Sequence, residues 1–227
     1  MFALDVPGIA PAKQLVEELG DSVTFYKLGL ELLMAGNYFE LLDWLIARDK
    51  KVFVDLKFFD VPQTVASAVT QLKRYGATFC TVHGNDSILK AAVEATEGSN
   101  LGILAVTALT SLDQGDIEDL GFKADVHQIV LGRARRALEI GCAGVISSGL
   151  EAPALREHVN NKLLVITPGI RPVANVDDQK RTVNVEQAFA NGADYIVVGR
   201  PIKNHKGYDS PRAAAEDIQQ RIAGVFA

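Results

Sequence analysis

The sequence has little of what marks a secreted, membrane-spanning or nucleic-acid-binding protein. Its two cysteines, Cys80 and Cys142, lie far apart and form no C-x-x-C pair, which excludes a disulfide framework and a zinc finger. The longest stretch without a charged residue, 98–112, spans 15 residues and includes Ser, Thr and Asn, so it is too short and too polar to cross a bilayer. The net charge of −5 argues against nucleic acid or an anionic membrane as the main partner.

Segments that would divide the chain are also missing. No Pro/Ser-rich linker, low-complexity tract or block of charge separates one part of the sequence from another. The composition is 48% hydrophobic and 22% charged, as in ordinary globular proteins. Met1 leads directly into apolar residues with no cationic region before it, so we expect no signal peptide. We therefore expect a soluble, reduced, cytoplasmic protein in which residues 1–227 form a single domain.

Eight short apolar runs recur along the chain, each followed by a longer segment of helical periodicity. Runs that are uniformly apolar favour parallel strands buried on both faces. The predicted strands are Phe2–Leu4, Val23–Tyr26, Val52–Val54, Phe79–Val82, Ile103–Val106, Gly144–Ile146, Leu163–Ile166 and Tyr195–Val198. The predicted helices include Ala12–Leu19, Tyr38–Ala47, Val65–Tyr75, Ile88–Thr96, Gln128–Ile140 and Ala213–Ile222.

Eight strand–helix units in 227 residues predict an α/β protein with the (β/α)8 TIM-barrel fold. An open, doubly wound sheet is the alternative, but no G-x-G-x-x-G fingerprint follows the first predicted strand. A barrel carries its chemistry at the carboxyl ends of its strands, so the residues that follow each apolar run are the candidates for function.

Charged residues gather at the ends of the first three predicted strands. Asp55 and Lys57 are two positions apart, so on an extended strand both side chains would point into the barrel mouth. Asp60 follows in the loop, and Asp5 and Lys27 end the first two strands. An ammonium held between carboxylates stays charged despite desolvation and suits the stabilisation of negative charge on carbon. The alternative interpretation is a solvated ion-pair network at the rim of a loop.

A second set of candidates follows the seventh and eighth predicted strands, where barrels commonly bind phosphate. The glycine of Thr167-Pro168-Gly169-Ile170-Arg171 and Gly199 before Arg200 would let backbone N–H groups approach phosphate oxygens. Arg200 would add a charge-assisted, bidentate contact. Gln179 lies in a long loop after the seventh strand, the kind of segment that closes over a ligand.

The order of these motifs resembles the orotidine 5'-monophosphate decarboxylase family. The resemblance extends over the whole chain and rests on Asp55-Leu56-Lys57-Phe58-Phe59-Asp60-Val61-Pro62-Gln63-Thr64, Ala3-Leu4-Asp5, Tyr26-Lys27-Leu28-Gly29, Leu109-Thr110-Ser111, Thr167-Pro168-Gly169-Ile170-Arg171 and Gly199-Arg200-Pro201. It implies a (β/α)8 barrel, a homodimer, and a carboxy-lyase that uses neither a metal nor an organic cofactor. The implied reaction converts orotidine 5'-monophosphate to uridine 5'-monophosphate and CO2, the last step of de novo pyrimidine nucleotide synthesis.

The resemblance also implies a role for each catalytic candidate. Lys57 would donate the proton to C6 of the pyrimidine, and Asp55 would lie beside the departing carboxylate. Asp60 and Thr64 would reach into the partner subunit's site. Asp60 would thereby complete an alternating array of charges with Lys27, Asp55 and Lys57.

The remaining site residues would bind the substrate. By the same resemblance, Asp5 and Lys27 would hold ribose hydroxyls, and Thr110 with Ser111 would line the base pocket. The residues implied at the 5'-phosphate are Gln179, Gly199 and Arg200, with Arg171 anchoring the closing loop.

Some residues depart from the family pattern. Phe59 stands where members often have His, Val61 and Gln63 replace the commoner Ile and Asn, and Asn85-Asp86 replace small residues and glycines after the fourth strand. None of these changes removes a charge from the array. We therefore expect them to alter the surroundings of the site and not its reaction.

Two other functions remain open. A sugar-phosphate decarboxylase or aldolase of the same superfamily, such as 3-keto-gulonate 6-phosphate decarboxylase or hexulose-phosphate synthase, shares the Asp-x-Lys-x-x-Asp core but acts through a metal-stabilised enediolate. The position of Lys27 is typically acidic there, so the lysine favours the nucleotide substrate. The other alternative is a non-catalytic barrel that binds a phosphorylated metabolite or serves as a scaffold, and the intact charge array argues against it.

Overall fold

A computed structural model describes residues 1–159, 161–171 and 182–227. Within them, eight parallel strands pair in the order of the sequence to form one sheet. The strands are β1 (Phe2–Ala3), β2 (Phe25–Leu28), β3 (Lys51–Phe58), β4 (Phe79–Val82), β5 (Gly102–Val106), β6 (Gly144–Ile146), β7 (Leu164–Thr167) and β8 (Tyr195–Ile196). All eight predicted apolar runs therefore contain strands, with boundaries shifted by a few residues.

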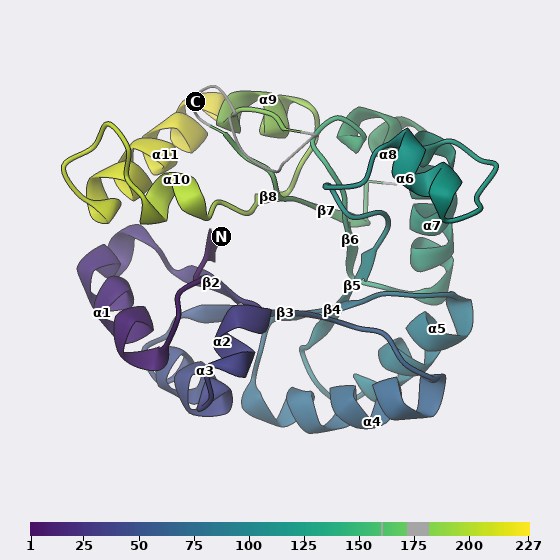
Figure 1. Cartoon of the computed structure of the whole chain (residues 1–227), viewed down its shortest axis with the longest axis horizontal. Helices are drawn as coiled ribbons and strands as arrows, with labels where there is room; N and C mark the ends of the chain where they lie inside the picture. Colours follow the sequence, from purple (N-terminus) through teal and green to yellow (C-terminus); the bar gives the residue numbers. More distant parts are fainter. Residues whose placement is uncertain (160, 172–181) are drawn as a thin grey trace.

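The sheet closes on itself where the chain after β8 returns to β1. The amide of Ala3 donates to the carbonyl of Val198 at 2.8 Å, and the amide of Val198 donates to the carbonyl of Met1 at 3.0 Å. A parallel bridge between Phe2 and Val198 accompanies these two bonds. Figure 1 shows the strands around a central space with the helices outside them. The predicted (β/α)8 barrel is confirmed, whereas the prediction of a single domain stays a prediction.

Helices cover the outside of the barrel (Figure 1). The longer ones are α1 (Ile9–Leu19), α3 (Tyr38–Ile46), α4 (Pro62–Leu72), α5 (Asp86–Ala95), α7 (Val126–Ile140) and α11 (Pro211–Val225), and all six were predicted. The helices α2 (Leu30–Met34), α6 (Gln114–Asp119), α8 (Ala152–His158), α9 (Val185–Ala190) and α10 (Arg200–Lys203) were not. These have at most seven residues, too few to establish a helical period. None of the helices described is both long and apolar enough to cross a membrane.

Side chains alternate between the inside and the outside of the barrel. On β3, for example, Val52 and Val54 belong to the large core between strands and helices, whereas Phe53 belongs to a smaller cluster inside the barrel. This follows from the two-residue period of a strand. The members of the inner cluster that are buried are Ala3, Phe25, Phe53, Phe79, Leu104, Ile166 and Val197.

Aromatic rings fill the end of the barrel at which the strands begin. The rings of Phe25 and Phe79 stack with centroids 5.9 Å apart, and Tyr195 packs edge-on against both, at 5.9 and 6.0 Å. Gly102 leaves space for this arrangement, because a Cβ at that position would lie 2.9 Å from the Phe79 ring. The rings thus close the lower end of the barrel with hydrocarbon.

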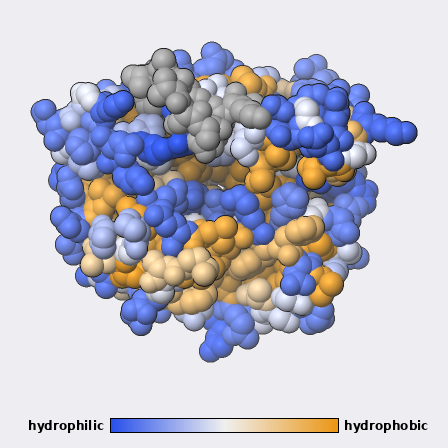
Figure 2. All heavy atoms as spheres, in the orientation of Figure 1, coloured by the Kyte–Doolittle hydropathy of each residue, from blue (hydrophilic) through white to orange (hydrophobic). Residues whose placement is uncertain are grey.

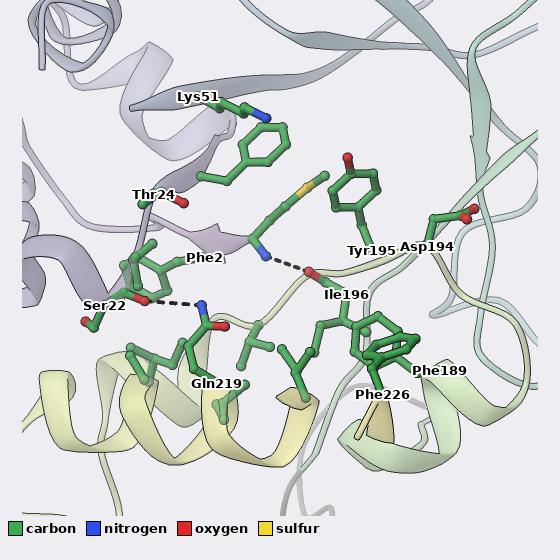
Figure 3. A pocket seen from close by; sticks show the side chains of 18 residues that line it. Phe2, Ser22, Thr24, Lys51, Phe189, Asp194, Tyr195, Ile196, Gln219 and Phe226 are labelled. Carbon is green, nitrogen blue, oxygen red and sulfur yellow. Dashed lines mark hydrogen bonds between the residues drawn. The ribbon is translucent and has the colours of Figure 1, made fainter. Parts of the chain in front are cut away.

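A cavity of about 370 Å³ with a mixed polar and apolar lining lies beside this end, between the strand starts and helix α11. Figure 3 shows the aromatic side chains of Phe2, Phe189, Tyr195 and Phe226 around it. The hydrogen bonds drawn there join backbone or amide groups, such as the Gln219 side chain, which donates to the carbonyl of Ser22 at 3.2 Å. None of the predicted site residues lines this cavity.

Candidate active site

Four charged side chains alternate in sign across the opposite end of the barrel, where the strands finish. The Lys27 ammonium lies 3.3 Å from Asp5 Oδ1 and 3.5 Å from Asp55 Oδ2. The Lys57 ammonium lies 2.9 Å from Asp55 Oδ1. Asp55 is therefore held between two lysines, one on each carboxylate oxygen. Figure 2 shows hydrophilic residues gathered around a hollow at the centre of one face of the molecule.

The charges at the centre of this row are shielded from water. The side chains of Lys27 and Asp55 are 11% and 13% exposed, whereas those of Lys57 and Asp5 are 35% and 45% exposed. Burial by itself raises the pKa of Asp55, but the Lys27 and Lys57 ammonium groups and hydrogen bonds from Lys57 and Thr81 outweigh it and hold that pKa below its ordinary value. Asp55 is thus a carboxylate that keeps its charge and holds two cations in fixed positions.

The backbone at Lys57 does not continue the extended strand. Its φ angle is 48°, in the left-handed region that residues other than glycine rarely occupy. The prediction that an extended backbone points Asp55 and Lys57 to the same side is therefore wrong at Lys57. The two side chains still meet, because a bulge in β3 accompanies this conformation: the pairing of β3 with β4 shifts register between Val54 and Phe58.

A buried threonine of β4 lies against the bulge. The Thr81 hydroxyl donates to Asp55 Oδ1 at 2.9 Å and accepts from the backbone amide of Lys57, also at 2.9 Å. Thr81 is fully buried. Thr81 was not among the residues predicted for the site, although it carries the one hydroxyl in the predicted strand Phe79–Val82. A polar side chain in a strand buried on both faces was the available signal.

A cavity of about 230 Å³ opens beside the charge row. Lys27, Asp55 and Lys57 form one side of it, and Thr110 and Ser111 belong to its lining. Several of its other walls, including those from Phe53, Ile146 and Val197, are apolar. Both residues predicted for the base pocket, Thr110 and Ser111, therefore line the same cavity as Lys57.

A second cavity of about 190 Å³ lies next to the first, and Lys27, Pro168 and Val197 line both. Its lining also includes Asp5 and the predicted phosphate-binding residues Arg171, Gly199 and Arg200. Gly199 lies close to β1, since a Cβ there would be 3.3 Å from the Cβ of Ala3. Gln179 lies outside the described residues.

Asp60 and Thr64 follow β3, with Asp60 in the loop and Thr64 in the first turn of α4. Both are exposed, and they line a hollow of about 340 Å³ that Lys57 also lines. The Asp60 carboxylate accepts from the backbone amide of Val61 at 2.6 Å. Among the described residues no ion pair joins Asp60 to a lysine or arginine of this chain. Within one chain the row is therefore Asp5, Lys27, Asp55 and Lys57, and completion of the row by Asp60 of a partner subunit stays a prediction.

Some residues that depart from the family pattern have local structural partners. The Asn85 side chain caps helix α5 by accepting from the amide of Ile88 at 3.3 Å. Asp86, in the first turn of that helix, pairs with Arg136. Phe59 is 67% exposed and packs edge-on against His83 with ring centroids 5.3 Å apart. None of them belongs to the charge row.

The described residues include no cluster of three or more His, Cys, Asp or Glu side chains suited to bind a metal ion. Both cysteines are buried and unpaired with each other. Burial raises the pKa of Cys142 to about 12, so its thiol is protonated at neutral pH.

The chain is similar to known proteins over most of its length. Residues 1–218 match the model of the orotidine 5'-phosphate decarboxylase / HUMPS family. The chain is 62% identical to an orotidine 5'-phosphate decarboxylase of Methylococcus capsulatus and 48% identical to one of Stenotrophomonas maltophilia; each alignment covers 100% of this chain and 93% of the relative. Among solved structures, the orotidine 5'-phosphate decarboxylase of Lactobacillus acidophilus superposes with a TM-score of 0.85 at 32% identity, over 97% of each chain.

Proposed function

Because this chain belongs to the orotidine 5'-phosphate decarboxylase / HUMPS family, we propose that it converts orotidine 5'-monophosphate to uridine 5'-monophosphate and CO2. This reaction is the last step of de novo pyrimidine nucleotide synthesis. The observation that carries the proposal is the position of Lys57, whose ammonium is paired with the buried Asp55 carboxylate and lines the cavity beside it.

The chemistry explains why a fixed cation is needed. When the bond between C6 and the carboxylate carbon breaks, its electron pair stays on C6 in the plane of the ring, where the π system cannot accept it. A preorganised positive charge next to that carbon stabilises it. Lys57 would supply the charge without a metal or organic cofactor, donate a proton from Nζ to C6, and then regain a proton from water. Asp55 would keep Lys57 charged before the reaction and hold it in place.

The two neighbouring cavities support an elongated substrate with a base at one end and a phosphate at the other. Thr110 and Ser111 would contact the pyrimidine, since they line the cavity of Lys57. Arg200 would bind the phosphate in the second cavity, where a guanidinium gives bidentate contacts.

The remaining substrate contacts lie around these two ends. We assign Asp5 and Lys27 to the ribose hydroxyls between the cavities and Gly199 and Gln179 to the phosphate, with Arg171 anchoring the closing loop. Enzymes lower barriers by roughly 8–23 kcal/mol, and binding energy at the phosphate would contribute by fixing the base against Lys57.

We also propose that the protein is a homodimer in which Asp60 and Thr64 complete the partner subunit's site. The two residues are exposed and line a hollow of their own chain that Lys57 also borders. Phe59 and Val61, on either side of Asp60, are 67% and 61% exposed, and apolar side chains of this size favour burial against a partner. The cytoplasmic location stays a prediction.

The proposal is tested by a spectrophotometric assay of the purified protein with orotidine 5'-monophosphate in the presence of EDTA. We expect turnover to uridine 5'-monophosphate that the chelator does not change. Absence of turnover would contradict the proposed substrate. Activity on a hexulose 6-phosphate that EDTA abolishes would instead assign the chain to the metal-dependent members of the superfamily. Sedimentation of the same preparation tests the dimer, which a species of 24.5 kDa would contradict.

A further inference from the structure

The Thr81 hydroxyl joins the two parts of β3 that carry the proposed chemistry. Its oxygen accepts a hydrogen bond from the backbone amide of Lys57 and donates one to the carboxylate of Asp55, each at 2.9 Å. A hydroxyl can do both at once because it has one donor and two acceptor sites. The side chain is fully buried, so water does not compete for either bond.

The position of Thr81 follows from the bulge in β3. Paired positions Val54 and Phe58 are separated by three residues on β3, but their partners Cys80 and Val82 are separated only by Thr81. The strand β3 therefore has more backbone amides than β4 has facing carbonyls. The Thr81 side chain accepts from the amide of Lys57 in place of a carbonyl, at the residue whose φ angle is 48°. The unusual backbone that directs Lys57 into the site is thus held from β4.

The same hydroxyl fixes the orientation of the Asp55 carboxylate. Oδ1 accepts from both Thr81 and Lys57, which leaves Oδ2 facing Lys27 at 3.5 Å. Rotation of the carboxylate would break the bond to Thr81 and change the distances to both lysines. Neighbouring inward positions on β4 offer no substitute, because Phe79 is apolar and packs in the aromatic cluster at the lower end.

We propose that Thr81 is a positioning residue: its hydroxyl sets the backbone of Lys57 and the rotation of the Asp55 carboxylate, and so places the ammonium that protonates the substrate. The inference rests on the proposed function in assigning the proton transfer to Lys57. Thr81 lies behind the charge row and does not line the cavity beside it. Its loss should therefore affect the chemical step more than the binding of substrate.

Three substitutions distinguish the effect of the Thr81 hydroxyl from that of the rest of the side chain. Thr81→Val keeps the volume and removes both hydrogen bonds, and Thr81→Ser keeps the hydroxyl and removes the methyl group. We expect Thr81→Val to lower kcat roughly 10- to 100-fold, as for loss of a hydrogen bond to a charged group, with KM within about threefold of wild type. Thr81→Ser should retain kcat within about threefold. If Thr81→Val does not fold, Thr81→Ala takes its place, and it should be less active than Thr81→Ser.

Thr107→Val is the matched control. Thr107 is also fully buried, and its hydroxyl donates to the carbonyl of Ile146 at 2.7 Å, with no contact to the charge row. This variant should keep its activity within about threefold. A Thr81→Val enzyme as active as wild type would overturn the inference. So would equal losses in Thr81→Val and Thr81→Ser, or an effect on KM alone.

A measurement independent of turnover distinguishes this inference from the proposed function. The carboxyl carbon of Asp55 can be titrated by NMR in protein labelled with 13C-aspartate, with Asp55→Asn to assign the signal. The groups around it that titrate or carry charge are Lys27, Lys57, Tyr38 and Cys80. We expect Thr81→Val to raise the midpoint of Asp55 and Thr107→Val to leave it unchanged. An unchanged midpoint in Thr81→Val overturns the inference even if wild type is a decarboxylase, whereas an inactive wild type with a raised midpoint in Thr81→Val overturns only the proposed function.

Discussion

The two ends of the barrel are built from the same strands and differ in chemistry within two residues. Phe25, Phe53 and Phe79 point inward at the lower end, and their rings pack against one another. Two positions further along each strand, the inward side chains are Lys27, Asp55 and Thr81, which meet in the charge row and its hydrogen bonds. Alternate residues of a strand share a face. The same strand pairing therefore places the aromatic cluster at one end of the barrel and the polar site at the other.

This difference teaches how the barrel carries buried charge. A carboxylate removed from water is costly unless it is paired and hydrogen-bonded, and Asp55 has two ammonium partners and a hydroxyl donor. The lower end contributes apolar burial, which is the main favourable term in folding. We therefore assign function to the upper end of the barrel, where the strands finish, and much of the stability to the lower end, where they begin. Each of the following substitutions tests one side of that division.

Lys57→Ala has the largest expected effect and falls on the upper end. Without the ammonium, nothing stabilises or protonates the carbanion, and we expect kcat for orotidine 5'-monophosphate to fall at least about 10⁴-fold, or more than about 5 kcal/mol of barrier. The melting temperature should change little, because Lys27 still pairs with Asp55. Steady-state kinetics and thermal unfolding measure the two effects. Lys51→Ala, an exposed lysine at the start of the same strand, is the control, and near-normal activity in Lys57→Ala would remove the lysine from the mechanism.

Phe79→Ala tests the lower end. Phe79 is 7% exposed and contacts the rings of Phe25, Phe53 and Tyr195, so its removal leaves a cavity inside the barrel. We expect the free energy of unfolding to fall by about 3–5 kcal/mol, with kcat of the folded protein within roughly tenfold of wild type. Phe122→Ala, at a residue 44% exposed, should cost less than about 1 kcal/mol. Urea unfolding at fixed protein concentration distinguishes them, and equal costs would contradict the assignment of stability to the aromatic cluster.

The smallest expected effect is on the pH dependence of stability, and it tests the contribution of the Asp55 carboxylate at the upper end. The folded protein holds the pKa of Asp55 below its ordinary value, so this carboxylate stabilises the fold above its unfolded pKa of about 4. That contribution is lost as the pH falls through the lower, folded value. We therefore expect urea unfolding to show a steeper loss of stability below about pH 4 in wild type than in Asp55→Asn.

Other carboxylates affect the pH dependence of stability equally in wild type and in Asp55→Asn, so their contribution cancels when the two proteins are compared. The Glu186 carboxyl, hydrogen-bonded by Arg221, has its pKa lowered to about 2 and contributes equally to both proteins. The same slope with pH in wild type and Asp55→Asn would show that the paired lysines do not favour the Asp55 carboxylate in the folded state.

The sequence was a good guide wherever a feature repeats with the period of a strand. Short runs of mostly apolar residues predicted all eight strands because burial on both faces excludes most polar residues. A charged residue at the end of a run then predicted the positions of Lys27 and Asp55. The conformation of Lys57 and the contact with Thr81 could not be predicted in this way. Both depend on the register between β3 and β4, which is set by tertiary pairing and leaves no periodic signal in either strand.

The short helices were missed for a related physical reason. A segment such as Arg200–Lys203 or Leu30–Met34 completes about one turn, so its apolar residues show no period. The residues alone left open whether Asp60 faces this site or that of a neighbouring subunit, and the prediction of a partner subunit came from the family resemblance. In the structure Asp60 lines a hollow together with Lys57 and forms no ion pair with it. Sequence spacing does not fix the direction of the turn after β3.

The closure between β1 and β8 has a consequence for biosynthesis. Asp5 and Arg200 line one cavity although almost the entire chain separates them, and they meet only where Ala3 bonds to Val198. A nascent chain on the ribosome therefore exposes Asp5 long before Arg200 is synthesised, and the cavity that both residues line forms only after that. Premature termination before residue 200 would leave a polypeptide that carries the charge row but lacks Arg200, so we expect catalytic competence to arrive in a single late step.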